Sequence, residues 1–404
     1  MDYTTPVVVL GVHYGSLGIA RSLGRLGVPV HGVHGNLGIP EFASRYFAGR
    51  HRWDFEQAAP ASSIEFLLDL RTKFDRDAIL VPTTDDTAQL LADHSATLRS
   101  GYRFQDNSPA LVRGLRRKWE LCTMAQHHGV PVPATLLPRS VREAVQLADR
   151  IGFPLMLKSS DGARLGARAL PKMVVVRTER ELMDNFARLE DPSDDSNLML
   201  QEYIPGGDDD VWMFNGYFDP RSHCVAGFTG KKLRQHPVGT GATSLGICSR
   251  NDVVHQLMSR FLGEIAYQGI IDIGLRYDAR DGQYKLLDVN PRIGATFRLF
   301  VGADGTDVVR LLYLDLTGAP LPVTEPVEGR KWLDERRDMY TSRECWRRGS
   351  LTFATWLRSF GGVRETAWFA LDDPIPFLRM AATLTMDAIR KVYRNAARLI
   401  GQAN

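Results

Sequence analysis

Short apolar runs alternate with amphipathic stretches over the first hundred residues of the chain. Runs of strand length and segments with helical spacing follow one another in this order: strand 6–13, helix 16–27, strand 28–35, strand 77–85 and helix 86–98. Strands separated by helices are typical of a parallel sheet whose faces are covered by helices. We therefore predict an N-terminal parallel α/β domain over residues 1–112.

The pattern changes after residue 112. An amphipathic helix at 116–128 is stopped by Gly129, and the apolar strand "FPLMLK" and the strand "KMVVV" follow it. Here strands adjoin other strands as well as helices, which indicates an α+β module. We predict that this module extends over residues 113–320.

A third region begins at the proline-rich stretch "PLPVTEPVEG". Residues 321–404 contain four of the seven tryptophans and many arginines, and they end in a basic amphipathic helix at 377–400. We expect a mostly helical C-terminal extension. Packing of its last helix on its own domain, or on a second subunit in a homodimer, is favoured over contact with a membrane surface.

Composition and charge narrow the class of function. The chain has 404 residues, 44% hydrophobic and 24% charged, which is typical of a globular protein with more than one core. A net charge of +3 argues against nucleic acid as the main partner. Four dispersed cysteines form no metal-binding pair, and no apolar run has spanning length. We expect a cytoplasmic protein without integral membrane association that acts on small molecules.

The first turn of the chain resembles a dinucleotide-binding loop only in part. Glycines lie at 11, 15 and 18, and His13 occupies the position of the second fingerprint glycine. The next strand also ends without the acidic residue that would hold a ribose. The sequence therefore argues against a nicotinamide cofactor.

The central region carries basic residues and polar segments on or at the ends of predicted strands. Lys158 ends an apolar strand and leads into "SSDGARLGA", whose two glycines would let backbone amides fold over phosphate oxygens. The strand end "MLQEYIPG" can contact an adenine through backbone N–H and C=O groups. The segment "GFTGKKLRQHP" has the pattern of a strand that carries Lys231, Lys232 and Arg234.

The stretch "LLDVNPRIG" places a carboxylate, an amide and a guanidinium within five residues after an apolar pair. Asp288 and Asn290 offer the oxygen ligands that Mg²⁺ prefers, and Arg292 offers a fork that matches phosphate or carboxylate. The alternative is an ordinary turn, because Asn-Pro commonly initiates turns.

In their order, these motifs resemble the ATP-grasp superfamily, and the tail extends the resemblance to its carboxylate–amine ligase branch, which includes D-aspartate ligases. The motifs are Lys118 at a helix start, Lys158 with its glycine loop, "QEYI", the basic strand and "DVNPR". The resemblance implies a pre-ATP-grasp N-terminal domain and a two-lobed ATP-grasp fold over 113–320, split near residue 200.

The resemblance also implies roles for individual residues. It assigns phosphate binding to Lys118 and Lys158, adenine binding to the segment Gln201, Glu202, Tyr203 and Ile204, ribose binding to Asp210, Mg²⁺ binding to Asp288 and Asn290, the γ-phosphate to Lys232 with Arg234 beside it, and the acyl-phosphate to Arg292. Mn²⁺ is a second metal that suits the same ligands.

Two positions depart from the family pattern. Relatives usually carry a further carboxylate about a dozen residues before the asparagine, where this chain has Gly274; Asp272, two residues earlier on the same strand face, is the expected substitute. In relatives, the metal ligand at the position of Asp288 is more often glutamate than aspartate. These departures make Asp272, Asp288 and Asn290 the expected metal ligands.

The resemblance implies an ATP-dependent ligase that activates a carboxylate as an acyl-phosphate and joins it to an amine. The alternatives are a carboxylase or kinase-like enzyme that forms no amide, and an inactive nucleotide-binding module. The sequence names neither substrate. "VPTTDDTAQ" offers Thr83, Thr84, Asp85 and Asp86 as substrate contacts, although Asp85 is also a candidate helix N-cap.

Overall fold

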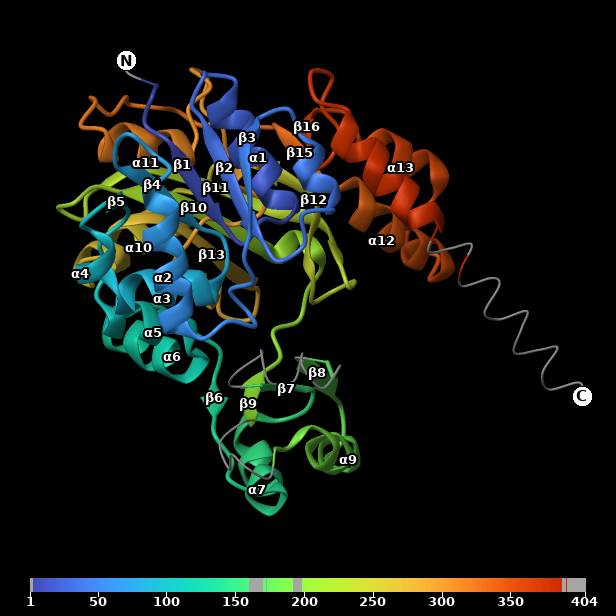
Figure 1. Cartoon of the computed structure of the whole chain (residues 1–404). Coiled ribbons are helices and arrows are strands. Elements are labelled where there is room, and N and C mark those ends of the chain that lie inside the picture. The colour runs from blue at the N-terminus through green and yellow to red at the C-terminus, as the bar shows by residue number, and fades with distance from the viewer. Residues whose placement is uncertain (1–2, 160–169, 172, 192–197, 387–389, 391–404) are drawn as a thin grey trace, which may run out of the picture. The chain divides into compact units, whose positions relative to one another are not determined.

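The computed structural model describes the chain except residues 1–2, 160–169, 172, 192–197, 387–389 and 391–404 (Figure 1). The chain divides into two compact units, each assembled from separate segments. Unit 1 contains residues 1–105, 234–248 and 292–404, and unit 2 contains residues 106–233 and 249–291. The predicted division at residues 112 and 320 is not tested by these units and stays a prediction.

Unit 1 is built on the predicted parallel sheet. Its five strands lie in the order β3-β2-β1-β4-β5, and all neighbours are parallel. The strands are β1 (Val7–Leu10), β2 (Val30–His34), β3 (Phe47–Arg52), β4 (Ala78–Pro82) and β5 (Tyr102–Arg103). Strand β1 lies at the centre, and its four residues are entirely buried, as expected for a parallel strand covered on both faces.

Helices cover the sheet of unit 1. Side chains of β1, β2 and β4 pack with α2 (Pro60–Arg71), α3 (Asp85–Asp93) and α4 (Ser95–Leu98) in one apolar cluster. Helices α1 (Tyr14–Gly24) and α11 (Val308–Leu316) pack on each other. Two short 3₁₀ segments, η1 (Pro40–Ala43) and η3 (Phe297–Leu299), complete this layer.

The C-terminal extension is part of unit 1 and adds strands as well as helices. Strand β12 (Ala242–Cys248) pairs antiparallel with β15 (Lys331–Leu333), which pairs parallel with β16 (Val363–Thr366). Helices α12 (Glu335–Arg347) and α13 (Phe353–Ser359) lie side by side (Figure 1), with Trp346 and Trp356 in edge contact. The predicted terminal helix is present from residue 375 to 386, and most of its remainder lies outside the described residues.

Buried ion pairs tie this extension to other segments of unit 1. Arg21 on α1 binds Asp373 at 3.0 Å, and both side chains are almost completely buried. Arg298 bridges Asp307 and Glu365. Because breaking such a pair would leave a buried charge unpaired, these contacts fix the extension in place.

Unit 2 has a larger and a smaller sheet. The larger one contains β14 (Gln283–Asn290), β13 (Gly269–Asp278), β10 (Val211–Phe218) and β11 (Cys224–His236), in that order and antiparallel where registers are defined. Helices α5 (Pro109–Arg116), α6 (Lys118–His127) and α10 (Asp252–Glu264) pack against it. Trp212, Phe214 and Ile273 point into this core, so alternate residues of the strands face the other way.

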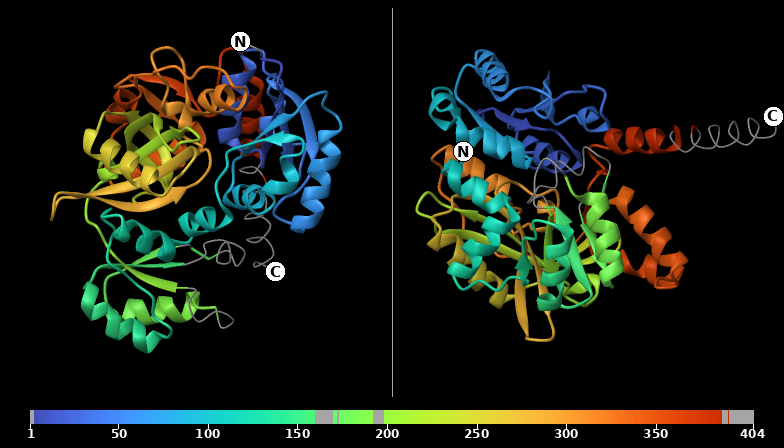
Figure 2. Two further views of the ribbon diagram at one scale, coloured as in Figure 1. Left: turned by 90° about the vertical axis from the view of Figure 1, so that its left-hand side faces the viewer. Right: turned by 90° about the horizontal axis from the view of Figure 1, so that it is seen from below.

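Unit 2 also contains a smaller sheet, and the predicted split into two lobes near residue 200 stays a prediction. This sheet has the order β6-β9-β7-β8, formed by β6 (Thr135–Leu136), β9 (Leu198–Glu202), β7 (Leu155–Ser159) and β8 (Met173–Val176). Helices α7 (Val141–Ile151) and α9 (Glu179–Leu189) cover one face of it (Figures 1 and 2). A 3₁₀ turn, η2 (Asp208–Asp210), links β9 to β10.

Several local expectations have direct outcomes. Strand β3 and helix α2 were not predicted by the sequence pattern. None of the four cysteines forms a disulfide. Within the described residues, no helix is long and apolar enough to cross a membrane.

Candidate functional site

The pairing of strands β13 and β14 in unit 2 brings the predicted metal ligands together. Asp272 lies directly opposite Asn290 across the β13–β14 pair, and Gly274 lies opposite Asp288. Directly opposed residues of an antiparallel pair project from the same face. Asp272, Asp288 and Asn290 therefore share the face of the sheet that points away from the helical core.

Asn290 connects the two carboxylates. Its side-chain nitrogen lies 3.3 Å from Asp272 Oδ2 and 3.2 Å from Asp288 Oδ2. Two carboxylates and an amide oxygen are a hard donor set that fits Mg²⁺, and a cation would relieve the repulsion between the carboxylates. In the described part of the chain, no group of three or more His, Cys, Asp or Glu side chains is arranged to hold a metal; the predicted set has two carboxylates and one amide.

Lys118 adds a cation to this cluster. It is the first residue of α6, as predicted, and its ammonium forms an ion pair with Asp288 Oδ1. Both side chains are partly exposed. The Lys118 ammonium therefore lies beside Asp288, where a metal ion bound by that carboxylate would also lie. The predicted contact of Lys118 with phosphate stays a prediction.

Lys158 lies on β7 and is held by the neighbouring strand. Its ammonium donates to the side-chain oxygen of buried Gln201, and the Gln201 amide nitrogen donates to Thr135 Oγ1 at 3.0 Å. Burial lowers the pKa of Lys158 to about 8, and the charge of Lys118 contributes to the lowering. The predicted glycine loop after Lys158, at residues 159–167, lies almost entirely outside the described residues.

Lys232 projects from the same face as Asp272. Lys231 lies opposite Trp212, which points into the core, and its ammonium is 5.1 Å from the centre of that indole ring. By strand alternation Lys232 faces the other way. Burial lowers the pKa of Lys232 to about 8, and the charges of Asp272 and Asp208 oppose this change.

The carboxylate of Glu202 has partners of its own. Its Oε1 pairs with Arg280 at 2.5 Å, and its Oε2 lies 3.4 Å from Lys285 Nζ and accepts the backbone N–H of Ala134 at 3.2 Å. Hydrogen bonding by Arg280 holds the pKa of the neighbouring Asp278 well below its usual range. The side chain of Glu202 is therefore anchored, which leaves the backbone after β9 as the candidate contact for an adenine.

Three further predicted residues follow this strand. Ile204 is buried and Tyr203 is half-buried. Asp210 ends η2 and accepts the backbone N–H of Gly207 at 2.8 Å. Their nucleotide contacts stay predictions.

Two predicted catalytic arginines belong to unit 1 instead. Arg234 is buried and makes a bidentate ion pair with Asp338, at 2.7 and 3.1 Å. This packing favours a structural role over the predicted catalytic one. Arg292 is partly buried, with its Nε 2.8 Å from Asp85 Oδ1.

The predicted substrate segment before α3 is engaged locally. Thr84, not Asp85, caps α3, so the alternative role of Asp85 as the N-cap is wrong. Asp85 is the first helical residue and binds Arg292. Thr83 donates its hydroxyl to the backbone oxygen of Leu10 at 2.8 Å.

Sequence reasoning missed the residues that support the predicted ones. Thr135 fixes the Gln201 amide, and Arg280 and Lys285 fix the Glu202 carboxylate. The turn near Gly282 indicates a hairpin between β13 and β14. Counting residue pairs outward from that turn would have placed Lys285 on the same face as Asp272. The pairing of this hairpin with β9 side chains had no sequence signal.

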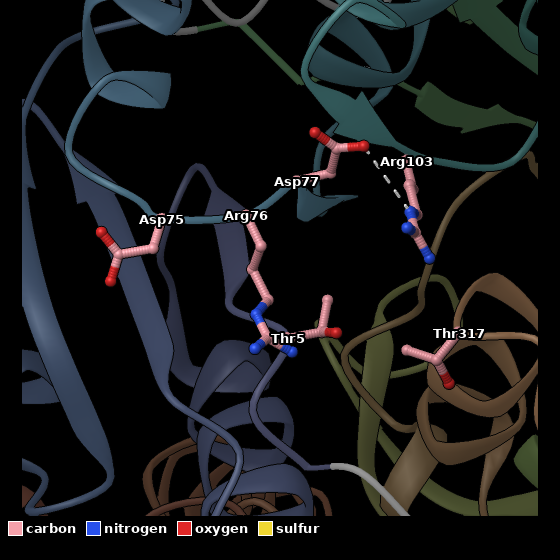
Figure 3. Close-up of a pocket in the computed structure, with 6 residues that line it drawn as sticks. All are labelled: Thr5, Asp75, Arg76, Asp77, Arg103 and Thr317. Carbon is pink, nitrogen blue, oxygen red and sulfur yellow. Dashed lines mark ion pairs between the residues drawn. The ribbon is translucent and has the colours of Figure 1, made fainter.

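A separate cavity in unit 1 contains none of the predicted residues. It has a volume of about 370 Å³ and is lined by Thr5, Asp75, Arg76, Asp77, Arg103 and Thr317 (Figure 3). Two of these, Asp77 and Arg103, lie 3.9 Å apart. Thr5 and Asp77 come before β1 and β4, and Arg103 is paired with Ile79 near the start of β4, so this cavity lies at the opposite end of these strands from the turn at Thr83.

The chain was compared with protein-family models and with curated proteins. No family model matches the chain. The D-aspartate ligase of Enterococcus faecium is 24% identical over 245 residues, which are 59% of this chain and 58% of that protein. The chain thus matches little more than half the length of this curated relative.

Solved structures share the architecture. The biotin carboxylase domain of Hydrogenobacter thermophilus 2-oxoglutarate carboxylase, solved as a dimer with MgADP, ADP and bicarbonate, has a TM-score of 0.62 at 15% identity, covering 82% of this chain and 74% of that one. The L-amino acid ligase of Bacillus licheniformis has a TM-score of 0.59 at 14% identity, covering 81% and 76%. The predicted fold class and the predicted resemblance to the ATP-grasp superfamily are confirmed.

Proposed function

We propose that the chain is an ATP-dependent ligase that activates a carboxylate as an acyl-phosphate and couples it to an amine. The observation that carries this proposal is the chain of contacts in unit 2 from Lys118 through Asp288 and Asn290 to Asp272. Lysines beside paired carboxylates are suited to a metal–triphosphate substrate. The likeness to D-aspartate ligase supports amide formation as the outcome.

The site supplies positioning and charge in place of a protein nucleophile. In the proposed reaction an oxygen of the carboxylate substrate attacks the γ-phosphorus, and ADP leaves. The amine then attacks the acyl carbon, loses a proton, and displaces inorganic phosphate. Such a reaction needs cations along the phosphates, and bound Mg²⁺ would supply part of that charge. Lys118, Lys158 and Lys232 are the proposed protein cations.

The proposed metal site is formed by Asp272, Asp288 and Asn290. The side-chain nitrogen of Asn290 now lies between the two carboxylates. With a cation present, rotation of the amide would turn its oxygen toward the metal. A metal readout separate from turnover, such as Mn²⁺ binding followed by electron paramagnetic resonance, therefore tests this ligand set.

The test of the function is phosphate release from ATP measured against panels of carboxylates and amines. A ligase requires both substrates, and hydroxylamine should trap the acyl-phosphate as a hydroxamate when the amine is left out. Phosphate release that needs neither substrate would contradict the proposal. The identity of both substrates and a homodimeric state, which the dimeric biotin carboxylase domain suggests, are part of the same proposal.

A second candidate is an ATP-dependent carboxylase. The observation that favours it is the likeness to a biotin carboxylase domain solved with bicarbonate. Phosphate release that depends on bicarbonate and on no other carboxylate would select this alternative.

A further inference from the structure

Arg276 is a buried cation that forms no ion pair with any residue that the structure describes. It lies on β13, and only 9% of its surface is exposed. Its Nε is inaccessible to solvent and has no hydrogen-bond partner, and among the described residues its guanidinium forms no ion pair. Arginine is almost never buried unpaired, since the loss of hydration is costly when nothing replaces it. The buried, unpaired guanidinium is therefore a candidate for binding an anionic ligand.

The strand register aims Arg276 at the candidate site. Arg276 follows Asp272 and Gly274 at alternate positions of β13, so all three project from one face. It lies opposite Val211 on β10, whose side chain faces the same way as that of Lys232. The charge of Arg276 also contributes to the lowered pKa of Lys232.

A glycine turn brings the fork of Arg276 to the edge of the predicted ribose site. A Cβ placed on Gly206 would lie 3.1 Å from Arg276 Nη2 and would collide with Asp210 Oδ2. Gly206 has a φ of +132°, which side-chain-bearing residues rarely adopt. On its other side Arg276 lies opposite Lys285, which contacts Glu202 at the end of β9.

We propose that Arg276 binds a phosphate group of the nucleotide, with its planar fork directed at two phosphate oxygens and Lys232 as the neighbouring cation. This inference rests on the proposed function, because it takes an adenine nucleotide as the ligand. A guanidinium matches phosphate in a bidentate geometry that an ammonium does not reproduce. Bound phosphate would supply the ion-pair partner that none of the described residues gives Arg276.

Arg276→Met tests this assignment by calorimetry with ADP and with adenosine as separate probes. We expect ADP affinity to fall about tenfold to a hundredfold, because a charge-assisted contact is lost. Adenosine affinity should not change, because adenosine has no phosphate. Arg276→Lys should recover only part of the ADP affinity. Arg250→Met, at an exposed arginine paired with Asp252 in the same unit, is the matched control.

The melting temperature of the ligand-free protein separates this role from a structural one. Removing an unpaired buried charge should leave that temperature unchanged or raise it, whereas loss of a structural contact should lower it. ADP affinity that Arg276→Met leaves intact, or equal losses for ADP and adenosine, would overturn the inference. Absence of ADP binding by the unaltered protein would instead overturn the proposed function.

Discussion

Asp272 and Asn290 face each other across the β13–β14 pair, with the Asn290 side-chain nitrogen 3.3 Å from Asp272 Oδ2. We predict that Asp272→Asn weakens Mn²⁺ binding about tenfold or more, because one of two ligand charges is lost. Electron paramagnetic resonance and the Mg²⁺ dependence of phosphate release measure this loss. Asp288→Asn should be at least as severe, and exposed Asp252→Asn is the control. A harmless Asp272→Asn beside a defective Asp288→Asn would remove Asp272 from the site.

Lys158→Met should weaken ADP binding strongly while the fold is retained. The ammonium of Lys158 donates to the side-chain oxygen of Gln201 in the protein, and a phosphate contact with a charged group is worth about 1.5–3 kcal/mol. We therefore expect a loss of about tenfold to a hundredfold in calorimetry. Lys231→Met is the matched control, because Lys231 lies on the face of β11 that points toward Trp212 and away from the candidate site. Equal losses in the two variants would mean that Lys158 has no specific role.

The affinity for ADP should decline as the pH rises above about 8. Burial lowers the pKa of Lys158 to about 8, so the ligand-free protein loses this positive charge well below the usual range of lysine. Between that pKa and the higher value in the unfolded chain, the unfolded state binds more protons. The contribution of Lys158 to stability is therefore unfavourable below pH 8 and becomes less so as the pH rises.

Calorimetric titrations between pH 7 and 9.5 test this dependence. Lys158→Met should flatten the part of the profile that belongs to this lysine, whereas Lys231→Met should retain the full slope. A pH-independent ADP affinity across the range would show that Lys158 keeps its proton.

Arg292→Lys should reduce turnover about a hundredfold or more and change ATP affinity much less. The reason is that lysine keeps the charge but loses the fork that would stabilise the acyl-phosphate. Paired measurements of turnover and ATP affinity in one preparation test this. Asp85→Asn removes the ion-pair partner of Arg292 and checks whether that pair alone matters. Unchanged turnover with a lowered melting temperature would assign Arg292 to the fold.

Glu202→Gln should lower stability more clearly than it lowers nucleotide affinity. The carboxylate accepts Arg280 and Lys285 and is partly exposed, so we expect a loss of about 1 kcal/mol in the free energy of unfolding. Urea denaturation and ADP calorimetry on the same variant give the two values. A large loss of ADP affinity at unchanged stability would show that the carboxylate itself contacts the nucleotide.

The sequence predicted strand ends better than it predicted partners. Asp288 and Asn290 were placed at the end of a strand because an apolar run precedes them and a proline follows, and both are local signals. The contact of Arg292 with Asp85 joins residues 207 positions apart, and no local pattern indicates such a pair. Arg234 was grouped with Lys232 by alternation, yet it is buried against Asp338 from the C-terminal extension.

For Arg276, too, the sequence indicates the position of the side chain but not its partners. Its place on the face of Asp272 was readable from the spacing of alternate residues. Whether it forms an ion pair depends on which carboxylates other elements bring near it, and tertiary structure alone decides that. A residue of this kind resembles an ordinary exposed arginine until its surroundings are known.

The buried pair of Arg21 and Asp373 has a consequence for synthesis of the protein. Its two members are 352 residues apart, so at about 5–20 residues per second the ribosome adds Asp373 roughly 20 to 70 s after Arg21. Throughout that interval the first α/β segment lacks the partner that neutralises its buried arginine. The residues of unit 2 are translated earlier and as an almost continuous stretch. Chains that terminate before Asp373 should accordingly be the ones that chaperones and proteases intercept.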